Sequence, residues 1–156
     1  MKNIKRLIKR LFVAIVALTF TLFFVGCNKD DDPIINDPVS GDRLKITVGS
    51  SVFSASLYDN ATASAFKAML PLTMNMGELN NNEKFYDFPN NLPSNAGNPG
   101  SILNGDIMLY GSRTLVLFYK SFSTSYSYTR IGKVDNTSGY AAALGSGTVN
   151  VKFELE

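Results

Sequence analysis

The side chains that could carry out chemistry in this sequence are few. Its 156 residues include no histidine, and Cys27 is the only cysteine. Catalytic systems built on histidine are therefore excluded, as are zinc sites with histidine ligands and the usual general base at neutral pH. The sequence also has no glycine-rich phosphate-binding motif and no dinucleotide-binding fingerprint. We expect neither a cofactor nor a metal ion.

Two carboxylates, Asp87 and Asp106, lie within stretches that we expect to form a sheet. A pair of carboxylates can hydrolyse a glycosidic bond if both converge on it. The simpler interpretation, which we favour, is that both are solvated residues at strand ends. No loop has the spaced oxygen ligands of an EF-hand calcium site. The sequence therefore gives no catalytic residue.

The best candidate for a binding surface is the segment 122–130. Its aromatic residues and its arginine alternate with serines and threonines, so as one strand they would share a face. Such a face can stack a small molecule or anchor a peptide or protein. The alternative is that the tyrosines pack in the core with their hydroxyls at its rim. Arg113 lies at an expected hairpin tip, where a solvated turn residue is more common. The possible ligand- or partner-binding residues are Tyr126, Tyr128, Arg130, Arg113 and Phe88.

The first 26 residues have the pattern of a secretory signal peptide. Five lysines and arginines precede an uncharged run of 15 residues from Leu11 to Val25. A membrane-spanning helix needs roughly 20 apolar residues, so the run fits a signal peptide better than a permanent span. Removing residues 1–26 takes away five of the 15 lysines and arginines and none of the 13 aspartates and glutamates, so the net charge changes from +2 to −3. The remaining chain has no basic patch for nucleic acid.

The uncharged run ends at Gly26-Cys27. This ending resembles the lipobox of bacterial lipoproteins, which implies that Cys27 receives a diacylglycerol and becomes the new N-terminus. Each buried methylene contributes about 0.8 kcal/mol, and two acyl chains anchor a protein stably where one does not. The alternative is an ordinary secretory signal followed by a chance cysteine. We expect Cys27 to carry the membrane anchor of the protein.

Residues 27–42 are expected to form an acidic tether, because three consecutive aspartates from Asp30 are followed by prolines and a glycine. Lys29-Asp30-Asp31 resembles the surface-export signal of Bacteroidetes lipoproteins. The resemblance implies an outer-membrane lipoprotein whose domain is exposed on the cell surface. A plain solvated tether is the alternative, and the two interpretations are compatible.

The elements that position these side chains are mainly strands. Alternating or apolar runs predict strands at 43–48, 53–57, 72–76, 84–88, 107–110, 115–119, 122–130 and 149–155. The run 115–119 lacks polar alternation and should be buried on both faces. Helical spacing after Asp59-Asn60 predicts about three turns that end at Pro71, and residues 137–144 predict a short Ala-rich helix. About eight strands and two short helices favour a closed barrel or a sandwich formed by residues 43–156, and pairing of the first and last strands would remove sheet edges.

The order of these elements, and three short motifs, resemble the bacterial cyclophilin-like barrel family. The motifs are Asp59 to Ala63 leading to Pro71, Gly105-Asp106-Ile107 with the strand 115–119, and Ile131-Gly132-Lys133-Val134. The resemblance covers residues 43–156 and implies a closed barrel with helices at its ends.

Cyclophilins proper isomerise X-Pro bonds with an arginine, a glutamine and an apolar pocket that contains Phe, Trp and His. This sequence has neither Trp nor His. Leu115 stands where the glutamine is expected, and the expected arginine falls near Asp87. These departures favour a non-catalytic binding or interaction domain. A divergent peptidyl-prolyl isomerase or an accessory to a redox enzyme system is the alternative that the resemblance implies.

Overall fold

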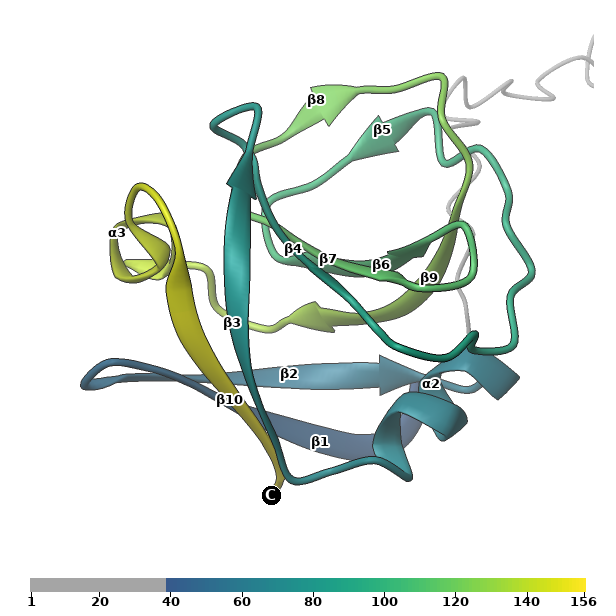
Figure 1. Cartoon of the computed structure of the whole chain (residues 1–156), viewed down its shortest axis with the longest axis horizontal. Coiled ribbons are helices and arrows are strands. Elements are labelled where there is room, and N and C mark those ends of the chain that lie inside the picture. Colours follow the sequence, from purple (N-terminus) through teal and green to yellow (C-terminus); the bar gives the residue numbers. More distant parts are fainter. Residues whose placement is uncertain (1–38) are drawn as a thin grey trace, which may run out of the picture. The chain divides into compact units, whose positions relative to one another are not determined.

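The computed structural model describes residues 39–156, which form a mainly β fold with two short helices. The strands are β1 (Val39–Val48), β2 (Ser51–Tyr58), β3 (Leu72–Leu79), β4 (Glu83–Asp87), β5 (Ser101–Ile102), β6 (Asp106–Tyr110), β7 (Thr114–Phe118), β8 (Phe122–Ser123), β9 (Tyr128–Val134) and β10 (Val149–Leu155). The helices are α2 (Ala61–Lys67) and α3 (Tyr140–Leu144). Eight strands make a closed antiparallel barrel in the order β1-β10-β3-β4-β7-β6-β9-β2, while β5 and β8 pair separately (Figure 1). The expected closed barrel is confirmed.

The N-terminal segments expected from the sequence lie outside the described residues. These are the signal peptide of residues 1–26, Cys27 and the tether as far as residue 38. β1 begins at Val39, so residues 39–42, the expected end of the tether, belong to the first strand. Pairing explains the earlier start, because Val39 lies opposite Tyr58 across an irregularity in the register. Within residues 39–156, neither helix is long and apolar enough to cross a membrane.

The first and last strands close the barrel, as their clear alternation predicts. In β1, Leu44, Ile46 and Val48 belong to the core and are buried. β10 pairs antiparallel with β1, with Ile46 opposite Phe153, and pairs with β3 on its other side. Because β10 completes the hydrogen bonding of both neighbours, it removes two strand edges that could otherwise pair with other chains.

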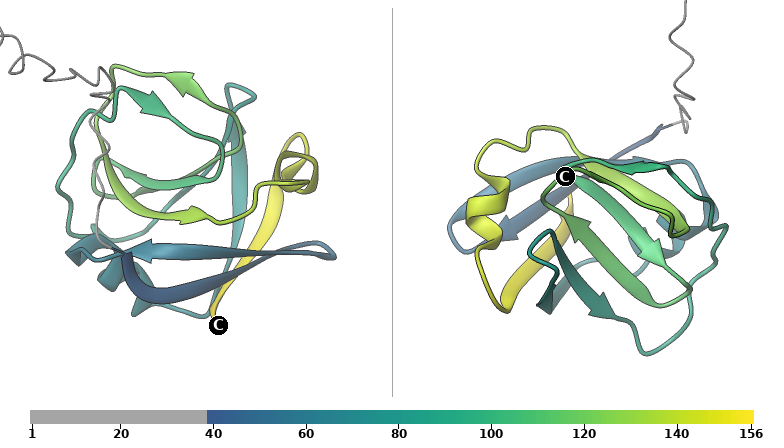
Figure 2. Two further views of the ribbon diagram at one scale, coloured as in Figure 1. Left: turned by 180° about the vertical axis from the view of Figure 1, so that it is seen from behind. Right: turned by 90° about the horizontal axis from the view of Figure 1, so that it is seen from above.

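The two helices lie on opposite sides of the barrel (Figures 1 and 2). α2 begins after Asn60, whose side-chain oxygen accepts a hydrogen bond from the backbone N–H of Ala63 at 2.9 Å. It ends at Lys67 and is shorter than the expected three turns, because residues 68–69 already form a turn. α3 ends at Gly145, whose φ of 59° is readily adopted by glycine. The start of α2 and the end of α3 are therefore each explained by a local residue, Asn60 and Gly145.

The buried side chains form two clusters, one on each side of the barrel wall. The main core lies inside and includes Phe66 from α2 and Tyr140 from α3. The second cluster combines outward side chains of β6, β7 and β9 with Ile102 of β5. β7 contributes to both, since Leu115 belongs to the inner cluster and Val116 to the outer one. The expected burial of this strand on both faces is confirmed.

The segment 122–130 does not form one strand, and that prediction is wrong. β8 ends at Ser123, and β9 begins only at Tyr128. Between them the Thr124 hydroxyl accepts a hydrogen bond from the backbone N–H of Tyr126 at 3.1 Å, a local turn that competes with the sheet. The alternation of hydroxyl and aromatic side chains predicted a strand, but the same hydroxyl groups can also form the turn that interrupts it.

Candidate functional site

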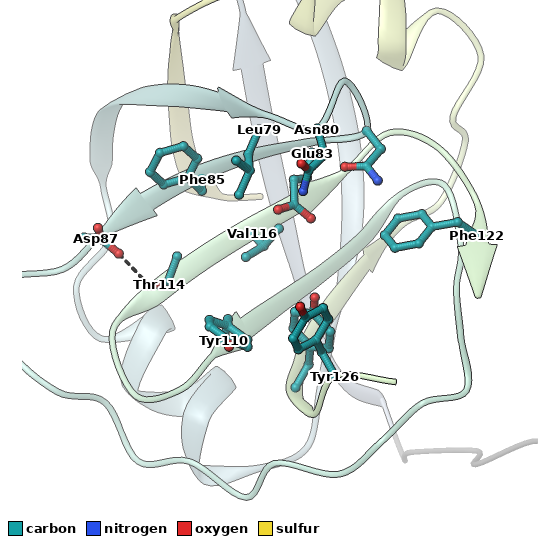
Figure 3. A pocket seen from close by; sticks show the side chains of 12 residues that line it. Leu79, Asn80, Glu83, Phe85, Asp87, Tyr110, Thr114, Val116, Phe122 and Tyr126 are labelled. Carbon is teal, nitrogen blue, oxygen red and sulfur yellow. Dashed lines mark hydrogen bonds between the residues drawn. The ribbon is translucent and has the colours of Figure 1, made fainter. Parts of the chain in front are cut away.

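A pocket of about 400 Å³ lies over β4, β6 and β7, on the outer face of the barrel (Figure 3). This volume falls in the range of sites for small molecules. Side chains from β8 and from the segment before β9 complete its wall. The pocket is lined by Leu79, Asn80, Asn82, Glu83, Phe85, Asp87, Tyr110, Thr114, Val116, Phe122, Tyr126 and Tyr128.

β4 supplies one wall through the alternation of its side chains. Glu83, Phe85 and Asp87 are two residues apart and all line the pocket. Lys84, between the first two, lies on the other side of the strand, where its Nζ donates a hydrogen bond to Glu78 at 2.5 Å. The strand therefore presents its carboxylates to the pocket and keeps its lysine away from it.

Glu83 is the most buried charged group of the pocket. The residue is 8% exposed, and its carboxylate is directed into the pocket (Figure 3). Among residues 39–156, no group donates a hydrogen bond to this carboxylate. Burial raises the pKa of Glu83, and the negative charge of Glu78 raises it further. The described part of the chain thus leaves a buried acid without a polar partner, facing an open space.

Asp87 differs from Glu83 in both exposure and partners. It lies at the exposed end of β4, and its Oδ1 accepts a hydrogen bond from the Thr114 hydroxyl at 2.5 Å. Glu83 and Asp87 are the only charged residues in the lining, which contains no lysine or arginine. The pocket consequently carries negative charge at both ends of one strand.

The opposite wall is a row of aromatic rings in mutual contact. Tyr110 packs edge-on against Tyr126, with ring centroids 6.1 Å apart, and lies 5.5 Å from Tyr128. Phe118 continues the row, with its centroid 5.5 Å from Tyr128 and 5.7 Å from Phe122. Tyr126 is 62% exposed, whereas Tyr128 is 9% exposed. The row is held by ring contacts within the protein, so the wall is formed before any ligand arrives.

The structure brings together some of the sequence-predicted binding residues and separates the others. Tyr126 and Tyr128 both line the pocket. Arg113 is exposed in the β6–β7 turn, and Arg130 lies in β9 outside the lining. Phe88 is 5% exposed and belongs to the inner core. Phe88 continues the alternation of β4 on the side opposite Asp87, and its ring lies 5.5 Å from that of Tyr86, which packs against the same core.

The two carboxylates considered from the sequence do not form a pair. Asp87 pairs with Thr114 at the start of β7, whereas Asp106 opens β6 beside the other end of β7. They are offset by four residues, roughly 13 Å, along β7, and they also lie on opposite sides of this strand. Asp106 is 7% exposed and accepts hydrogen bonds from the Leu103 N–H at 2.8 Å and from Lys133 Nζ at 3.2 Å. It therefore holds the start of β6, and it is not a solvated strand end as expected.

A second polar cluster lies beside the pocket but has its partners within the protein. Lys84 is fully buried, and its Nζ also donates to the backbone oxygen of Gly147 at 2.6 Å. The Tyr119 hydroxyl donates to Glu78 at 2.6 Å. Burial acts to raise the pKa of Glu78, but the hydrogen bonds from Lys84 and Tyr119 outweigh it and leave the pKa below its ordinary value. This cluster joins β3, β4 and the loop before β10, which is a structural role.

Sequence reasoning missed the groups that define the site chemically. Glu83, Phe85 and Tyr110 line the pocket but are absent from the expected set. The alternation Glu83-Lys84-Phe85-Tyr86-Asp87 was the available signal, since it places two acids and a phenylalanine on one strand face. Groups of three or more metal-ligating side chains are absent among residues 39–156. The arrangement provides acceptors and apolar contact area, suited to a ligand that is apolar and donates hydrogen bonds or carries positive charge.

Comparison with known proteins gives the family of this chain. No curated protein matches it. It is similar to the solution structure of the hypothetical protein AF2241 from Archaeoglobus fulgidus, with 18% identity and a TM-score of 0.52, over 76% of this chain and 98% of that one. That likeness concerns the fold. The model of the Cyclophilin-like family matches residues 46–155, which include all of the barrel except the first part of β1. This chain therefore belongs to the Cyclophilin-like family.

Proposed function

We propose that this chain is a lipid-anchored, non-catalytic binding protein of the outer membrane, exposed on the cell surface, and that the pocket over β4, β6 and β7 is its ligand site. The observation that carries the proposal is the pocket itself: about 400 Å³, with an aromatic wall, a buried acid and no converging pair of catalytic groups in its lining. Preformed pockets with a few placed polar groups are the usual form of a small-ligand site.

The pocket residues differ from those expected of a prolyl isomerase. The resemblance to cyclophilins proper requires an arginine beside the prolyl amide, yet Asp87 lies near that position and no arginine lines the pocket. Leu115, near the expected glutamine, points into the barrel core. Thr114 and Val116 face the pocket instead. A peptide isomerisation assay should give the uncatalysed rate, and a clear acceleration would contradict a purely binding role.

The pocket is tested by a ligand screen on the wild-type protein and on Tyr126→Ala. Tyr126 is 62% exposed, so its truncation removes part of the pocket wall with little effect on the core. Leu103→Ala is a matched control, since Leu103 is also exposed, at 49%, and lies outside the pocket. We expect hits to weaken with Tyr126→Ala and not with Leu103→Ala. Hits that bind equally to both variants would place the binding site elsewhere.

The anchor and the location rest on the sequence around Cys27. Cys27→Ser should release the protein from the membrane fraction and remove the acyl mass from its N-terminus. Substituting Lys29, Asp30 and Asp31 with alanine should keep the protein membrane-bound but protect it from protease added to intact cells. A Cys27→Ser protein that stays membrane-bound with unchanged mass would overturn the anchor. Alanine substitutions that leave protease access unchanged would reduce residues 29–31 to a plain tether.

A further inference from the structure

We infer that the pocket recognises a protonated amine on an apolar stem, and that Glu83 is the counter-ion of this amine. The inference rests on the proposed function, because it assigns a ligand class to the same pocket. It is carried by a buried acid that has no partner in the described chain, in a pocket whose other charged group is also an acid.

Glu83 has no hydrogen-bond donor within the described part of the chain, although the residue is buried. The residue is 92% buried, its carboxylate is directed into the pocket, and no residue from 39 to 156 donates a hydrogen bond to it (Figure 3). Buried polar groups nearly always have a partner, and an unpartnered carboxylate destabilises the fold. The nearest lysine along the chain, Lys84, lies on the other side of the strand, where its Nζ donates to Glu78 and to the backbone oxygen of Gly147. A donor for this carboxylate must then come from outside the described chain, either from water in the pocket or from a ligand that displaces it.

The charged residues of the lining bear on the charge of the ligand. The lining contains Glu83 and Asp87 and no cationic side chain, so a carboxylate or phosphate would meet two like charges and no counter-charge. An ammonium group would meet the opposite charge at Glu83, and the side-chain amide oxygen of Asn80 in the same lining is a further acceptor. The site therefore selects a cation over an anion.

The apolar residues of the lining bear on the rest of the ligand. Phe85 and Val116 form the floor beside Glu83, while Phe122 and Tyr126 stand across from it (Figure 3). An ammonium between a carboxylate and aromatic rings gains both an ion pair and a cation–π contact. An apolar stem attached to it would cover the floor. A free amine and a lysine side chain next to an apolar residue share this chemistry.

Other ionisable groups near Glu83 do not supply the positive charge. Glu78 from β3 is acidic and already engaged by Lys84 and Tyr119. Tyr128 from β9 and Tyr119 after β7 interact with the Glu83 charge, and burial, as the largest cause, raises the pKa of each. Both are therefore neutral at physiological pH, and Asp87 is an acid. A positive charge beside Glu83 has to arrive with the ligand.

The test compares 2-phenylethylammonium with 2-phenylethanol, its neutral analogue, by NMR titration of the wild-type protein, Glu83→Gln and Asp87→Asn. We expect the amine to bind the wild type more tightly than the alcohol, and Glu83→Gln to weaken amine binding by about 10-fold or more while it leaves the alcohol unchanged. Asp87→Asn is the matched control, because Asp87 is exposed and already bonded to Thr114, and should weaken the amine by less than about threefold. Equal amine binding by wild type and Glu83→Gln would overturn the inference.

Two further measurements keep the test decisive. On the wild type alone, amine affinity should increase as the pH rises through the Glu83 titration, while alcohol affinity should not; a flat amine profile contradicts the inference whether or not Glu83→Gln folds. The peptide acetyl-Phe-Lys-Phe-amide is compared with its analogue in which norleucine replaces lysine. If the protein prefers the lysine peptide and Glu83→Gln removes that preference, the ligand is an amine carried by a protein. If only the small amine binds tightly, the ligand is a free amine.

The inference and the proposed function fail differently. If the alcohol shifts the resonances of pocket residues as strongly as the amine does, and Tyr126→Ala abolishes both effects, the pocket binds ligands but the amine assignment is wrong. If neither probe nor any screened compound shifts the resonances of pocket residues, the binding function itself is overturned.

Discussion

Gly77 of β3 and Phe85 of β4 face each other across the ladder, and the ring of Phe85 occupies the space that a side chain at residue 77 would need. A Cβ built on Gly77 would lie 2.8 Å from Cε1 of this ring. The absence of a side chain on β3 therefore sets the position of an aromatic ring in the pocket on the neighbouring strand. This contact links a glycine outside the pocket to the shape of its floor.

Gly77→Ala should displace the Phe85 ring and reshape the pocket floor. Because the ring must move by several tenths of an ångström, we expect a loss of about 1 to 3 kcal/mol in the free energy of unfolding, together with weaker ligand binding. Urea denaturation and the probe titration measure the two effects. Gly97→Ala is the control, because a Cβ there meets nothing within 4 Å and its φ is not positive. Equal effects of the two substitutions would contradict the link between Gly77 and the pocket.

Lys84→Met should strongly destabilise the barrel. Lys84 is fully buried, and its removal leaves Glu78, whose side chain is 17% exposed, without its cationic partner. Loss of one partner of a buried ion pair typically costs about 3 to 5 kcal/mol. Lys45→Met is the control, since Lys45 pairs with Glu154 at the surface and should cost less than about 1 kcal/mol. Denaturation curves that coincide for the two variants would show that the buried pair contributes little.

Glu83→Gln should stabilise the protein, and more so as the pH rises. The pKa of Glu83 is raised in the folded state, so folding favours the protonated acid. The contribution of Glu83 to the free energy of unfolding is fully present below the pKa that this residue has in the unfolded chain. It is lost as the pH rises through the pKa of Glu83 in the folded protein. Above that point the glutamine variant should be more stable than the wild type by about 1 to 3 kcal/mol, because it no longer buries an unpaired charge. Denaturation midpoints of both proteins between about pH 4 and pH 8 check this.

Glu78 should contribute the opposite slope. Its pKa is lowered in the folded state by Lys84 and Tyr119, against the effect of burial, so its contribution to stability is present above the unfolded pKa and is lost as the pH falls through the folded pKa. Glu78→Gln should therefore cost stability at neutral pH and much less in acid. Parallel curves for Glu78→Gln and Glu83→Gln would show that the two acids do not differ in environment.

Tyr140→Phe should make the protein more stable. The Tyr140 hydroxyl is buried in the main core with no hydrogen-bond partner among the described residues, so its removal relieves an unsatisfied polar group. We expect a gain of about 1 kcal/mol. Tyr119→Phe is the matched control with the opposite sign: its hydroxyl donates to Glu78, and we expect a loss of about 2 kcal/mol. The same sign of change in both variants, measured by chemical denaturation, would refute this assignment.

The parts of the fold that could be predicted are those in which a strand has one buried face. β1 and β10 alternate clearly, and their pairing followed from the need to close the sheet. The segment 122–130 alternates equally well, yet Thr124 forms a local turn there. Side-chain hydrogen bonds to the backbone compete with the ladder, and alternation does not report which of the two prevails.

Only part of the pocket could be predicted from the sequence, because its walls come from segments that are far apart along the chain. Tyr126 and Tyr128 attracted notice as aromatic residues in a polar run. Glu83 did not, because an acid beside a lysine in a short strand usually marks a solvated face. Its burial depends on what other segments place over β4, among them Phe122, and that proximity exists only in the closed barrel.

The position of β10 between β1 and β3 bears on how the chain acquires its structure during synthesis. Leu44 pairs with Leu155, so the register that seals the wall joins residues more than a hundred positions apart. Contacts of such sequence separation form late, and a nascent chain that ends before Val149 would present two unpaired edges. The native state is therefore reachable only after the last residues have emerged. Until β10 is available the barrel cannot close, and a chain that ends before it would be an aggregation-prone product instead of a smaller folded domain.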